Sequence, residues 1–197
     1  MTPYRVILVR HGETAWNQEG RFLGQSNPGL NEMGELQAQV AADILNGEKI
    51  DRIFSSDMLR TFETSQIIAQ GHNVLVKEMP FLREINFGAW EGLTFNEIQN
   101  NYPVLLNKWL KDPFKVRIPG GETAEEVWCR VLEGWKIIST ANSYADIVAI
   151  VAHGGSLRLL LCHLTGLDPS RQWEFALGHG EIIILEKNGD IYSVLDK

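Results

Sequence analysis

The chain has 197 residues, a length that fits one domain with a substantial buried core. Apolar residues make up 44% of the sequence and charged residues 22%, the usual balance in globular proteins. The formal net charge of −7 argues against general nucleic-acid binding, which requires a basic surface, so an anionic ligand would need a local basic pocket.

Nothing in the sequence indicates a targeting segment or a membrane span. The N-terminus leads directly into a strand-like run, and the longest apolar runs, such as residues 147–152, are too short to cross a membrane. Cys129 and Cys162 lie in helical patterns without metal or redox spacing, and we expect both to be buried free thiols. These features favour a cytoplasmic location.

The strand-like run at residues 5–9 ends in a sharp change of chemistry at Arg10, His11 and Gly12. Ligands collect at the carboxyl ends of strands in open α/β sheets, so we expect the mouth of a site here. Arg10 offers a planar set of donors for phosphate or carboxylate, and His11 can be a nucleophile, an acid/base or a metal ligand. Gly12 would let the backbone approach a ligand closely.

A loop at residues 21–30, rich in Gly, Asn and Pro, separates this junction from the next helix. Asn31 is a candidate N-cap, and Asn46-Gly47 ends the helix after residue 45. In an amphipathic helix the apolar stripe faces the core. Here the stripe consists of Leu36, Val40, Ala41, Ile44 and Leu45.

Strands and helices continue to alternate toward the C-terminus. The sequence predicts strands at 52–55, near 74–77 and at 146–152, helices at 58–69, 121–141 and 154–164, and a hairpin at 182–194. In the helix at 121–141, Thr123 and Glu126 fit a capping box. Its buried stripe is expected to hold Val127, Val131, Trp135 and Ile138.

The middle segment, residues 79–121, is less regular and rich in aromatic residues. Short helices are expected at 94–101 and 103–111. No linker composition separates the segment from its surroundings, so we interpret it as an insertion that covers the active-site face within a single domain, 1–197. Strand–helix alternation with buried strands predicts a three-layer α/β/α sandwich with a mostly parallel sheet and an antiparallel strand from the hairpin.

Two later strand–helix junctions carry side chains that suit an anion. Arg60 would lie in the first turn of its helix, where free backbone N–H groups and the helix dipole favour negative charge. His153 ends the strand at 146–152, and two glycines then open a helix. Taken alone, Arg60 could be a solvated surface residue and His153 a core histidine bonded to a carbonyl.

Five strings together resemble the histidine phosphatase superfamily, which includes the cofactor-dependent phosphoglycerate mutases. They are Arg-His-Gly-Glu-Thr at 10–14, Ser-Asp-Met-Leu-Arg-Thr at 56–61, Leu-Arg-Glu-Ile-Asn-Phe-Gly-Ala-Trp-Glu-Gly at 82–92, Pro-Gly-Gly-Glu-Thr at 119–123 and Ala-His-Gly-Gly at 152–155. The resemblance covers nearly the whole chain, and the family has the three-layer architecture that the pattern predicts.

The resemblance implies a phosphohistidine mechanism that needs no metal or cofactor. His11 would be the nucleophile and Glu84 the proton donor to the leaving group. The phosphoryl group would be held by Arg10, Arg60, His153, Asn17 and the backbone N–H of Gly154. Glu91 is the rival carboxylate, although its Trp-Glu-Gly context is more typical of a turn.

The other histidines give weaker signals. His72 lies in a helix-to-strand turn, His163 lies within a helix, and His179 precedes the hairpin at a position where the family more often carries asparagine. We assign none of them a role. The histidine and acidic residues lack the spacing of a metal-ligand set, so no metal is expected.

The chain is shorter than the phosphoglycerate mutases of the superfamily, which favours hydrolysis over mutase activity. Among the small phosphatases, residues 82–94 with Pro-Gly-Gly-Glu look most like α-ribazole-5′-phosphate phosphatases of cobalamin assembly. The same strings occur in broad-specificity and sugar-phosphate phosphatases, and some superfamily members are catalytically silent binding modules. We expect a small phosphorylated metabolite as the binding partner and keep a homodimer open.

Overall fold

The computed structural model describes residues 2–141 and 147–196. Its strands are β1 (Arg5–Arg10), β2 (Arg52–Ser55), β3 (Val76–Glu78), β4 (Ile147–Ala152), β5 (Ile182–Asn188) and β6 (Ile191–Asp196). They form one sheet in the order β3-β2-β4-β1-β5-β6, in which β3, β2, β4 and β1 are parallel and the terminal hairpin is antiparallel. The predicted mostly parallel sheet is confirmed.

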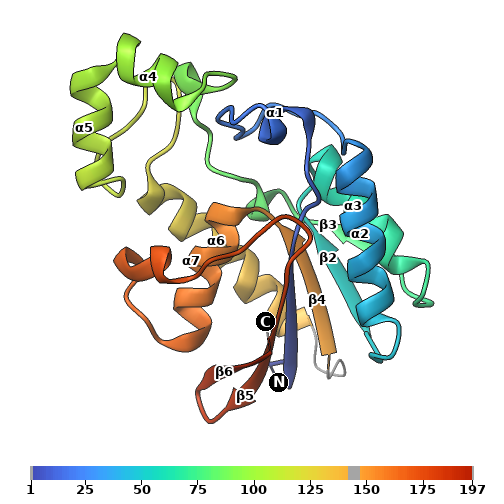
Figure 1. The fold of residues 1–197 in the computed structure, drawn as a ribbon. Coiled ribbons are helices and arrows are strands. Elements are labelled where there is room, and N and C mark those ends of the chain that lie inside the picture. Colours follow the sequence, from blue (N-terminus) through green and yellow to red (C-terminus); the bar gives the residue numbers. More distant parts are fainter. Residues whose placement is uncertain (1, 142–146, 197) are drawn as a thin grey trace.

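Helices cover both faces of the sheet (Figure 1). They are α1 (Ala15–Gln18), α2 (Glu32–Leu45), α3 (Leu59–Ala69), α4 (Phe95–Asn101), α5 (Pro103–Lys111), α6 (Ala124–Ala141) and α7 (Gly154–Thr165), with 3-10 turns η1 (Pro80–Leu82), η2 (Gly88–Trp90) and η3 (Pro169–Glu174). No helix within the described ranges is both long and apolar enough to span a membrane.

Alternation along the strands explains the three layers. In β1, Val6 and Leu8 belong to a core with α6 and α7, whereas Ile7 and Val9 belong to a second core with α2 and α3. Successive side chains of a strand point to opposite faces, so one apolar run supplies both cores. The predicted α/β/α sandwich is confirmed.

The predicted elements agree closely with the structure. Most boundaries match within three residues, and the Thr123–Glu126 capping box forms as expected. The four-residue helix α1 was not predicted, because a single turn has no visible periodicity. Asp146, the first residue of the predicted fourth strand, lies outside the described residues.

The prediction for the apolar stripe of α2 is wrong in part. Ala41 and Leu45 are buried, but Leu36, Val40 and Ile44 are 58%, 50% and 62% exposed. The helix instead turns small residues toward the sheet. An added Cβ on Gly34 would lie 2.0 Å from the carbonyl oxygen of Glu13, so only glycine allows this close packing of α2 against the loop after β1.

The prediction that both cysteines are buried is also wrong in part. Both are free, but only Cys162 is buried and Cys129 is exposed. Val127 and Val131 of α6 face the core. Cys129 lies midway between them, about 200° around the helix from each, so its thiol points outward.

The segment 79–121 has a small apolar core of its own. Ile98 of α4 and Leu106 and Trp109 of α5 pack with Trp90 and Ile118. These two helices stand apart from the sheet at the upper left of Figure 1. That the chain is a single domain, with segment 79–121 as an insertion, stays a prediction.

Candidate active site

Three neighbouring strands end side by side and deliver three polar side chains to one place. His11 follows β1, His153 follows β4, and Ser56 follows β2. Backbone hydrogen bonds extend the ladder past the strand ends, from His11 N to Ala152 O at 3.0 Å and from Ser56 N to Val151 O at 3.0 Å. The rings of His11 and His153 are consequently 5.2 Å apart between centroids.

The backbone fixes the tautomer of His11. Its Nδ1 lies 2.6 Å from the carbonyl oxygen of Gly12. A carbonyl oxygen only accepts hydrogen bonds, so Nδ1 carries the proton and donates it. In the neutral ring Nε2 is then unprotonated and holds a free lone pair, which is the form that a nucleophile requires.

His11 remains neutral because of its surroundings. Burial lowers its pKa well below the usual value, and the charges of Arg60 and Arg10 lower it further. The side chain is 3% exposed. A neutral nucleophile next to two cations is an arrangement that favours reaction with an anion.

Arg60 is fully buried without a salt bridge. Its Nη atoms donate to the carbonyl oxygens of Gly24 at 2.7 Å and Ser26 at 2.9 Å, and Nε has no partner in the described structure. The Glu91 carboxylate holds that loop by accepting from the backbone N–H groups of Gln25 and Ser26. Glu91 therefore shapes a turn, as its sequence context indicated, and through it positions Arg60.

Arg10 lies opposite and is held in a similar way. It donates to the carbonyl oxygen of Leu177 at 2.7 Å and to Nε2 of His179 at 2.8 Å. Its guanidinium packs against Gly154, where an added Cβ would be 3.5 Å from Cζ. Within the described residues neither Arg10 nor Arg60 forms a direct ion pair; burial lowers the pKa of both guanidiniums, and the negative charge of Glu84 acts against this lowering.

His179 is a member of this site to which the sequence analysis assigned no role. Its ring centroid is 5.5 Å from that of His11. Burial and the charge of Arg10 lower its pKa to about 4. At neutral pH His179 is therefore uncharged and accepts the hydrogen bond of Arg10. The only sequence signal was its place in the Gly-His-Gly-Glu turn before the hairpin.

His153 is fully buried beside His11. Its Nε2 lies 3.0 Å from the Ser56 hydroxyl, and its Nδ1 has no partner in the described part of the chain. Burial lowers its pKa well below the usual value, with a further contribution from Arg60. Ser56 belongs to the motif at 56–61, but the sequence did not predict its contact with this histidine.

Glu84 reaches the site from segment 79–121. Its Oε2 accepts from the backbone N–H of Gly155, at the start of α7, and its Oε1 accepts from the N–H of Ile85, both at 2.9 Å. An added Cβ on Gly155 would lie 2.4 Å from Oε1, so any other residue here would displace the carboxylate from this position.

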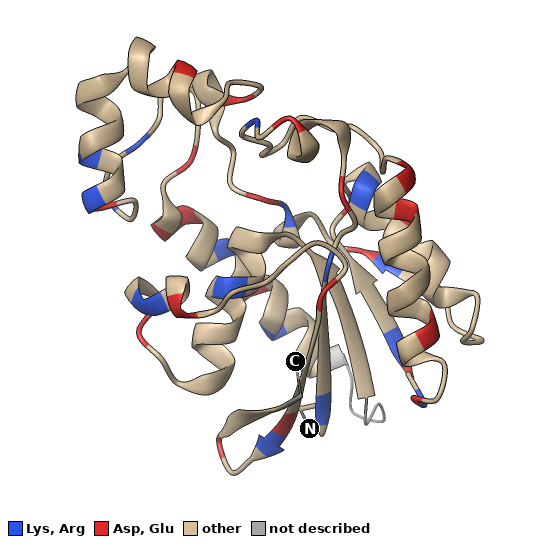
Figure 2. Cartoon of the chain, viewed as in Figure 1, with Lys and Arg blue, Asp and Glu red and all other residues tan. Residues whose placement is uncertain are grey.

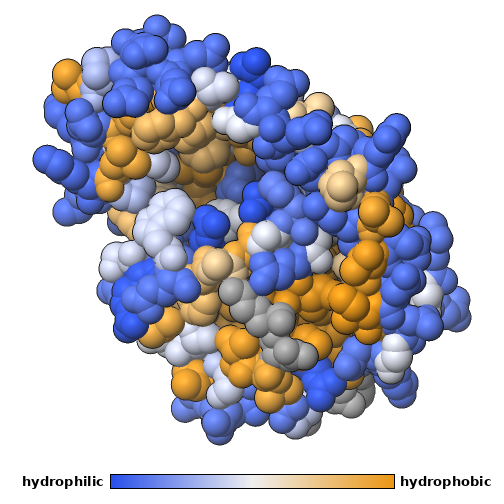
Figure 3. Space-filling model, viewed as in Figure 1, coloured by the Kyte–Doolittle hydropathy of each residue, from blue (hydrophilic) through white to orange (hydrophobic). Residues whose placement is uncertain are grey.

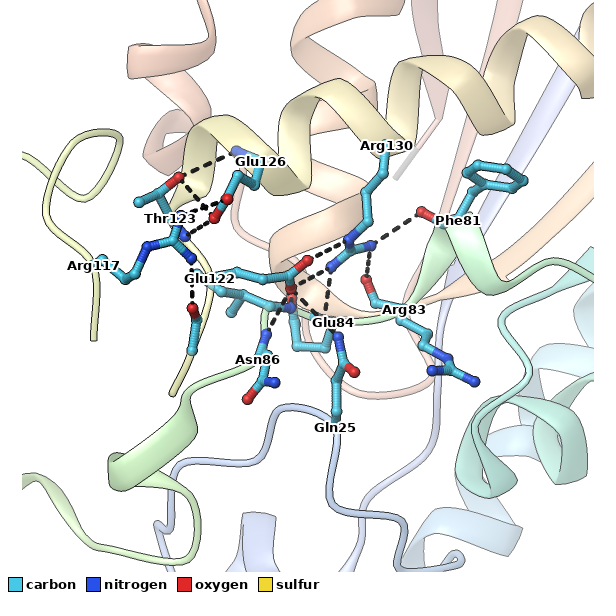
Figure 4. Close-up of polar contacts among 12 residues, drawn as sticks. Gln25, Phe81, Arg83, Glu84, Asn86, Arg117, Glu122, Thr123, Glu126 and Arg130 are labelled. Carbon is cyan, nitrogen blue, oxygen red and sulfur yellow. Dashed lines mark hydrogen bonds and ion pairs between the residues drawn. The ribbon is translucent and has the colours of Figure 1, made fainter. Parts of the chain in front are cut away.

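Arg130 of α6 fixes the segment that carries Glu84 (Figure 4). Its guanidinium donates to the carbonyl oxygens of Phe81, Arg83 and Glu84 and pairs with Glu122 at 2.9 Å. Sequence reasoning missed this residue. The sequence signal that could have found it was its position next to Val131, in the buried stripe of the helix predicted at 121–141.

Two further predictions concern the loop after β1. Gly12 packs against the backbone of Gly34, where a Cβ would lie 2.2 Å from the carbonyl oxygen, so close backbone packing already requires glycine here, and the approach of a ligand stays a prediction. The Asn17 side chain caps α1 by accepting from Thr14 N, and it also lines the cavity described next. A binding role for Asn17 stays a prediction.

A cavity of about 340 Å³ opens beside Arg10 and Glu84. Gly154, Gly155 and Arg158 of α7 line one wall, and Phe22, Phe87 and Trp109 line the opposite one. Figure 3 shows this hollow beneath the part of the chain that carries α4 and α5. In Figure 2, basic and acidic segments lie side by side near the upper ends of the strands, and further acidic segments lie along α2.

The remaining candidates lie elsewhere. Arg83 pairs with Asp57, and His163 faces Trp128 with 6.1 Å between ring centroids. His72 lies after α3, outside the lining of the cavity. Among residues 2–141 and 147–196 no group of three or more His, Cys, Asp or Glu side chains could hold a metal ion.

We predict that the free energy of unfolding falls as the pH is lowered from about 6.5 toward about 4. The pKa of His179 is about 4 in the folded chain against about 6.5 when unfolded, and the pKa values of His11 and His153 move in the same direction. Protonation therefore favours the unfolded chain in this window. Urea unfolding at several pH values measures the loss, which should be smaller in His179→Asn; an equal loss in the variant would contradict the contribution of His179.

Comparisons with known proteins agree with this geometry. The family model of the histidine phosphatase superfamily (branch 1) matches residues 6–196. Phosphoserine phosphatase 1 of Hydrogenobacter thermophilus is 34% identical over 92% of this chain and 85% of its own. Phosphoglycerate mutase-like protein 4 of Arabidopsis thaliana is 37% identical over 79% of this chain and 68% of its own.

The crystal structure of the α-ribazole phosphatase of Shigella flexneri superposes with a TM-score of 0.89 at 25% identity, covering 96% of this chain and 94% of that one. The family match spans all three strand ends that bring His11, Ser56 and His153 together and also α3, which carries Arg60. The chain therefore belongs to the histidine phosphatase superfamily.

Proposed function

We propose that this phosphatase hydrolyses phosphomonoesters without a metal, through a phosphohistidine on His11. In the first step Nε2 of His11 attacks phosphorus in line, and the P–O bond to the leaving group breaks. Arg10, Arg60, His153, Asn17 and the N–H of Gly154 bind the equatorial oxygens. In the second step water attacks the phosphohistidine, which releases phosphate and restores His11.

One observation carries this proposal: the unprotonated Nε2 belongs to a buried His11 on which the positive charges of Arg60 and Arg10 act, and neither arginine forms a direct ion pair within the described residues. A phosphoryl group would give both guanidiniums a direct anionic partner, and backbone carbonyls already hold the two side chains in place. Charge stabilisation by groups oriented in advance supplies most of the acceleration in phosphoryl transfer.

Glu84 is the proposed acid and base. It borders the cavity where a leaving group would lie, and two backbone N–H groups hold its carboxylate. Glu84 would protonate the leaving oxygen in the first step and accept a proton from the attacking water in the second. No other carboxylate lines that cavity within the described residues.

The test is phosphate release from p-nitrophenyl phosphate in the presence of EDTA. We predict that EDTA leaves the rate unchanged and that vanadate inhibits competitively, because it occupies the anion site. Vanadate should also raise the unfolding temperature, since a ligand that binds only the folded state stabilises it. Activity lost with EDTA and restored by a divalent ion would refute the metal-independent mechanism.

The physiological substrate is a finer proposal. The structural likeness to the Shigella flexneri enzyme supports α-ribazole 5′-phosphate, and the aromatic wall of the cavity would suit its planar base. The relative from Hydrogenobacter thermophilus supports phosphoserine at higher sequence identity. The test compares kcat/KM over a panel of α-ribazole phosphate, phosphoserine, phosphoglycerates, sugar phosphates and nucleotides. A strong preference for one substrate identifies it, similar values across the panel indicate a broad-specificity enzyme, and no hydrolysis indicates a catalytically silent module.

We further propose a cytoplasmic location and a homodimer. Two free cysteines are usual in a reducing compartment. A second subunit would cover the exposed apolar residues of α2, and light scattering measures whether one is present.

A further inference from the structure

Arg158 is a cation of the cavity that has no place in the proposed phosphoryl chemistry. It lies on α7 four residues after Gly154, so both face the cavity from the same side of the helix. Its Nε donates to the carbonyl oxygen of Phe175 at 3.1 Å, and its guanidinium lies over the Trp173 ring at 5.2 Å from the centroid. The side chain is thus held in place.

The other arginines that line the cavity already have partners. Arg10 donates to Leu177 and His179, and Arg21 donates to the carbonyl oxygen of Gly92 and pairs with Glu19. The two terminal nitrogens of Arg158 have no acceptor among the described residues. A guanidinium whose Nε is already hydrogen-bonded, and whose two terminal nitrogens have no acceptor, can donate two parallel hydrogen bonds to an anion.

The spacing indicates which anion this would be. Four residues of α-helix rise about 6 Å, so Arg158 lies roughly one turn from the Gly154 end, where the phosphoryl group would bind. An anion bound by Arg158 would therefore belong to the leaving group of the same substrate. A carboxylate separated from the ester oxygen by two carbons, as in phosphorylated hydroxy acids, spans such a distance.

We propose that Arg158 is a specificity-determining residue that binds a carboxylate on the leaving group, so that phosphorylated small hydroxy acids are the preferred substrate class. This inference rests on the proposed phosphatase function. It favours substrates such as phosphoserine and 3-phosphoglycerate over α-ribazole 5′-phosphate, which has no carboxylate.

The test uses two substrate pairs that differ in the carboxylate: phosphoserine with phosphoethanolamine, and 3-phosphoglycerate with glycerol 3-phosphate. We expect the wild-type enzyme to prefer the carboxylate member of each pair by about 10- to 100-fold in kcat/KM, the worth of a hydrogen-bonded charge. In Arg158→Met this ratio should fall toward one, mainly through a higher KM for the carboxylate substrates.

Arg171→Met is the matched control. Arg171 is exposed on η3, pairs with Glu174 at 2.7 Å and does not line the cavity, so its loss should leave the ratio unchanged. Arg158→Gln is a second variant in case the methionine variant folds poorly. It keeps a polar group near Phe175 but removes the charge, so we expect it to lose the carboxylate preference as well.

A wild-type ratio near one in both pairs, or a ratio retained in both Arg158 variants, would overturn the inference. Hydrolysis of p-nitrophenyl phosphate keeps the two proposals apart. If the wild type hydrolyses it and the pairs show no carboxylate preference, only the inference fails. If no phosphomonoester is hydrolysed, the proposed function fails first.

Discussion

His11→Ala is expected to lower kcat for p-nitrophenyl phosphate by at least about a thousandfold while the fold is retained. The variant removes the atom that would bond to phosphorus, and the Nε2 atoms of the two neighbouring histidines already have partners. His153 has its Nε2 against Ser56, and His179 accepts from Arg10 through Nε2. Steady-state phosphate release measures the loss of kcat, and far-UV circular dichroism measures whether the fold is retained.

The intermediate gives a second measurement of the same residue. Wild-type enzyme quenched in alkali during turnover should carry one phosphoryl group on His11, detected by mass spectrometry, and His11→Ala should carry none. His163→Ala is the matched control, because the ring of His163 faces Trp128 and not His11. Turnover within tenfold of wild type in His11→Ala would refute the nucleophile assignment.

The location of the site follows from sequence patterns that are local. Each of β1, β2 and β4 is a short apolar run followed at once by a polar side chain, and such runs predict both a strand and its carboxyl end. Parallel strands end at the same edge of a sheet, so His11, Ser56 and His153 had to lie near one another once the strands were neighbours.

The supports of the site were harder to predict because they depend on tertiary contacts. Arg130 bonds to backbone carbonyls 46 to 49 positions away in the chain, and Arg10 bonds to one 167 positions away. A carbonyl acceptor has no side-chain signature, so the sequence does not reveal which arginine it will hold. The prediction for the apolar stripe of α2 was wrong in part for a similar reason. The spacing of apolar residues alone does not show whether the large or the small ones face the sheet.

Glu84→Gln is expected to slow the hydrolysis of alkyl phosphates by about 100- to 10,000-fold, and that of p-nitrophenyl phosphate much less. An alkoxide must be protonated as it leaves, whereas p-nitrophenolate is stable without a proton. Glutamine has the same shape but no proton to give. Single-turnover phosphorylation rates for the two kinds of ester isolate this step from hydrolysis of the intermediate.

A purely structural role for Glu84 would give a different result. The carboxylate also accepts from Gly155 and Ile85, and glutamine offers only one acceptor oxygen for these two donors. Such a disturbance would slow both kinds of ester alike. Glu63→Gln is the control, because Glu63 also accepts a backbone N–H, that of Leu30, but lies outside the cavity. An equal loss for alkyl and p-nitrophenyl esters in Glu84→Gln would therefore make Glu84 a positioning residue and leave the leaving group without its proposed acid.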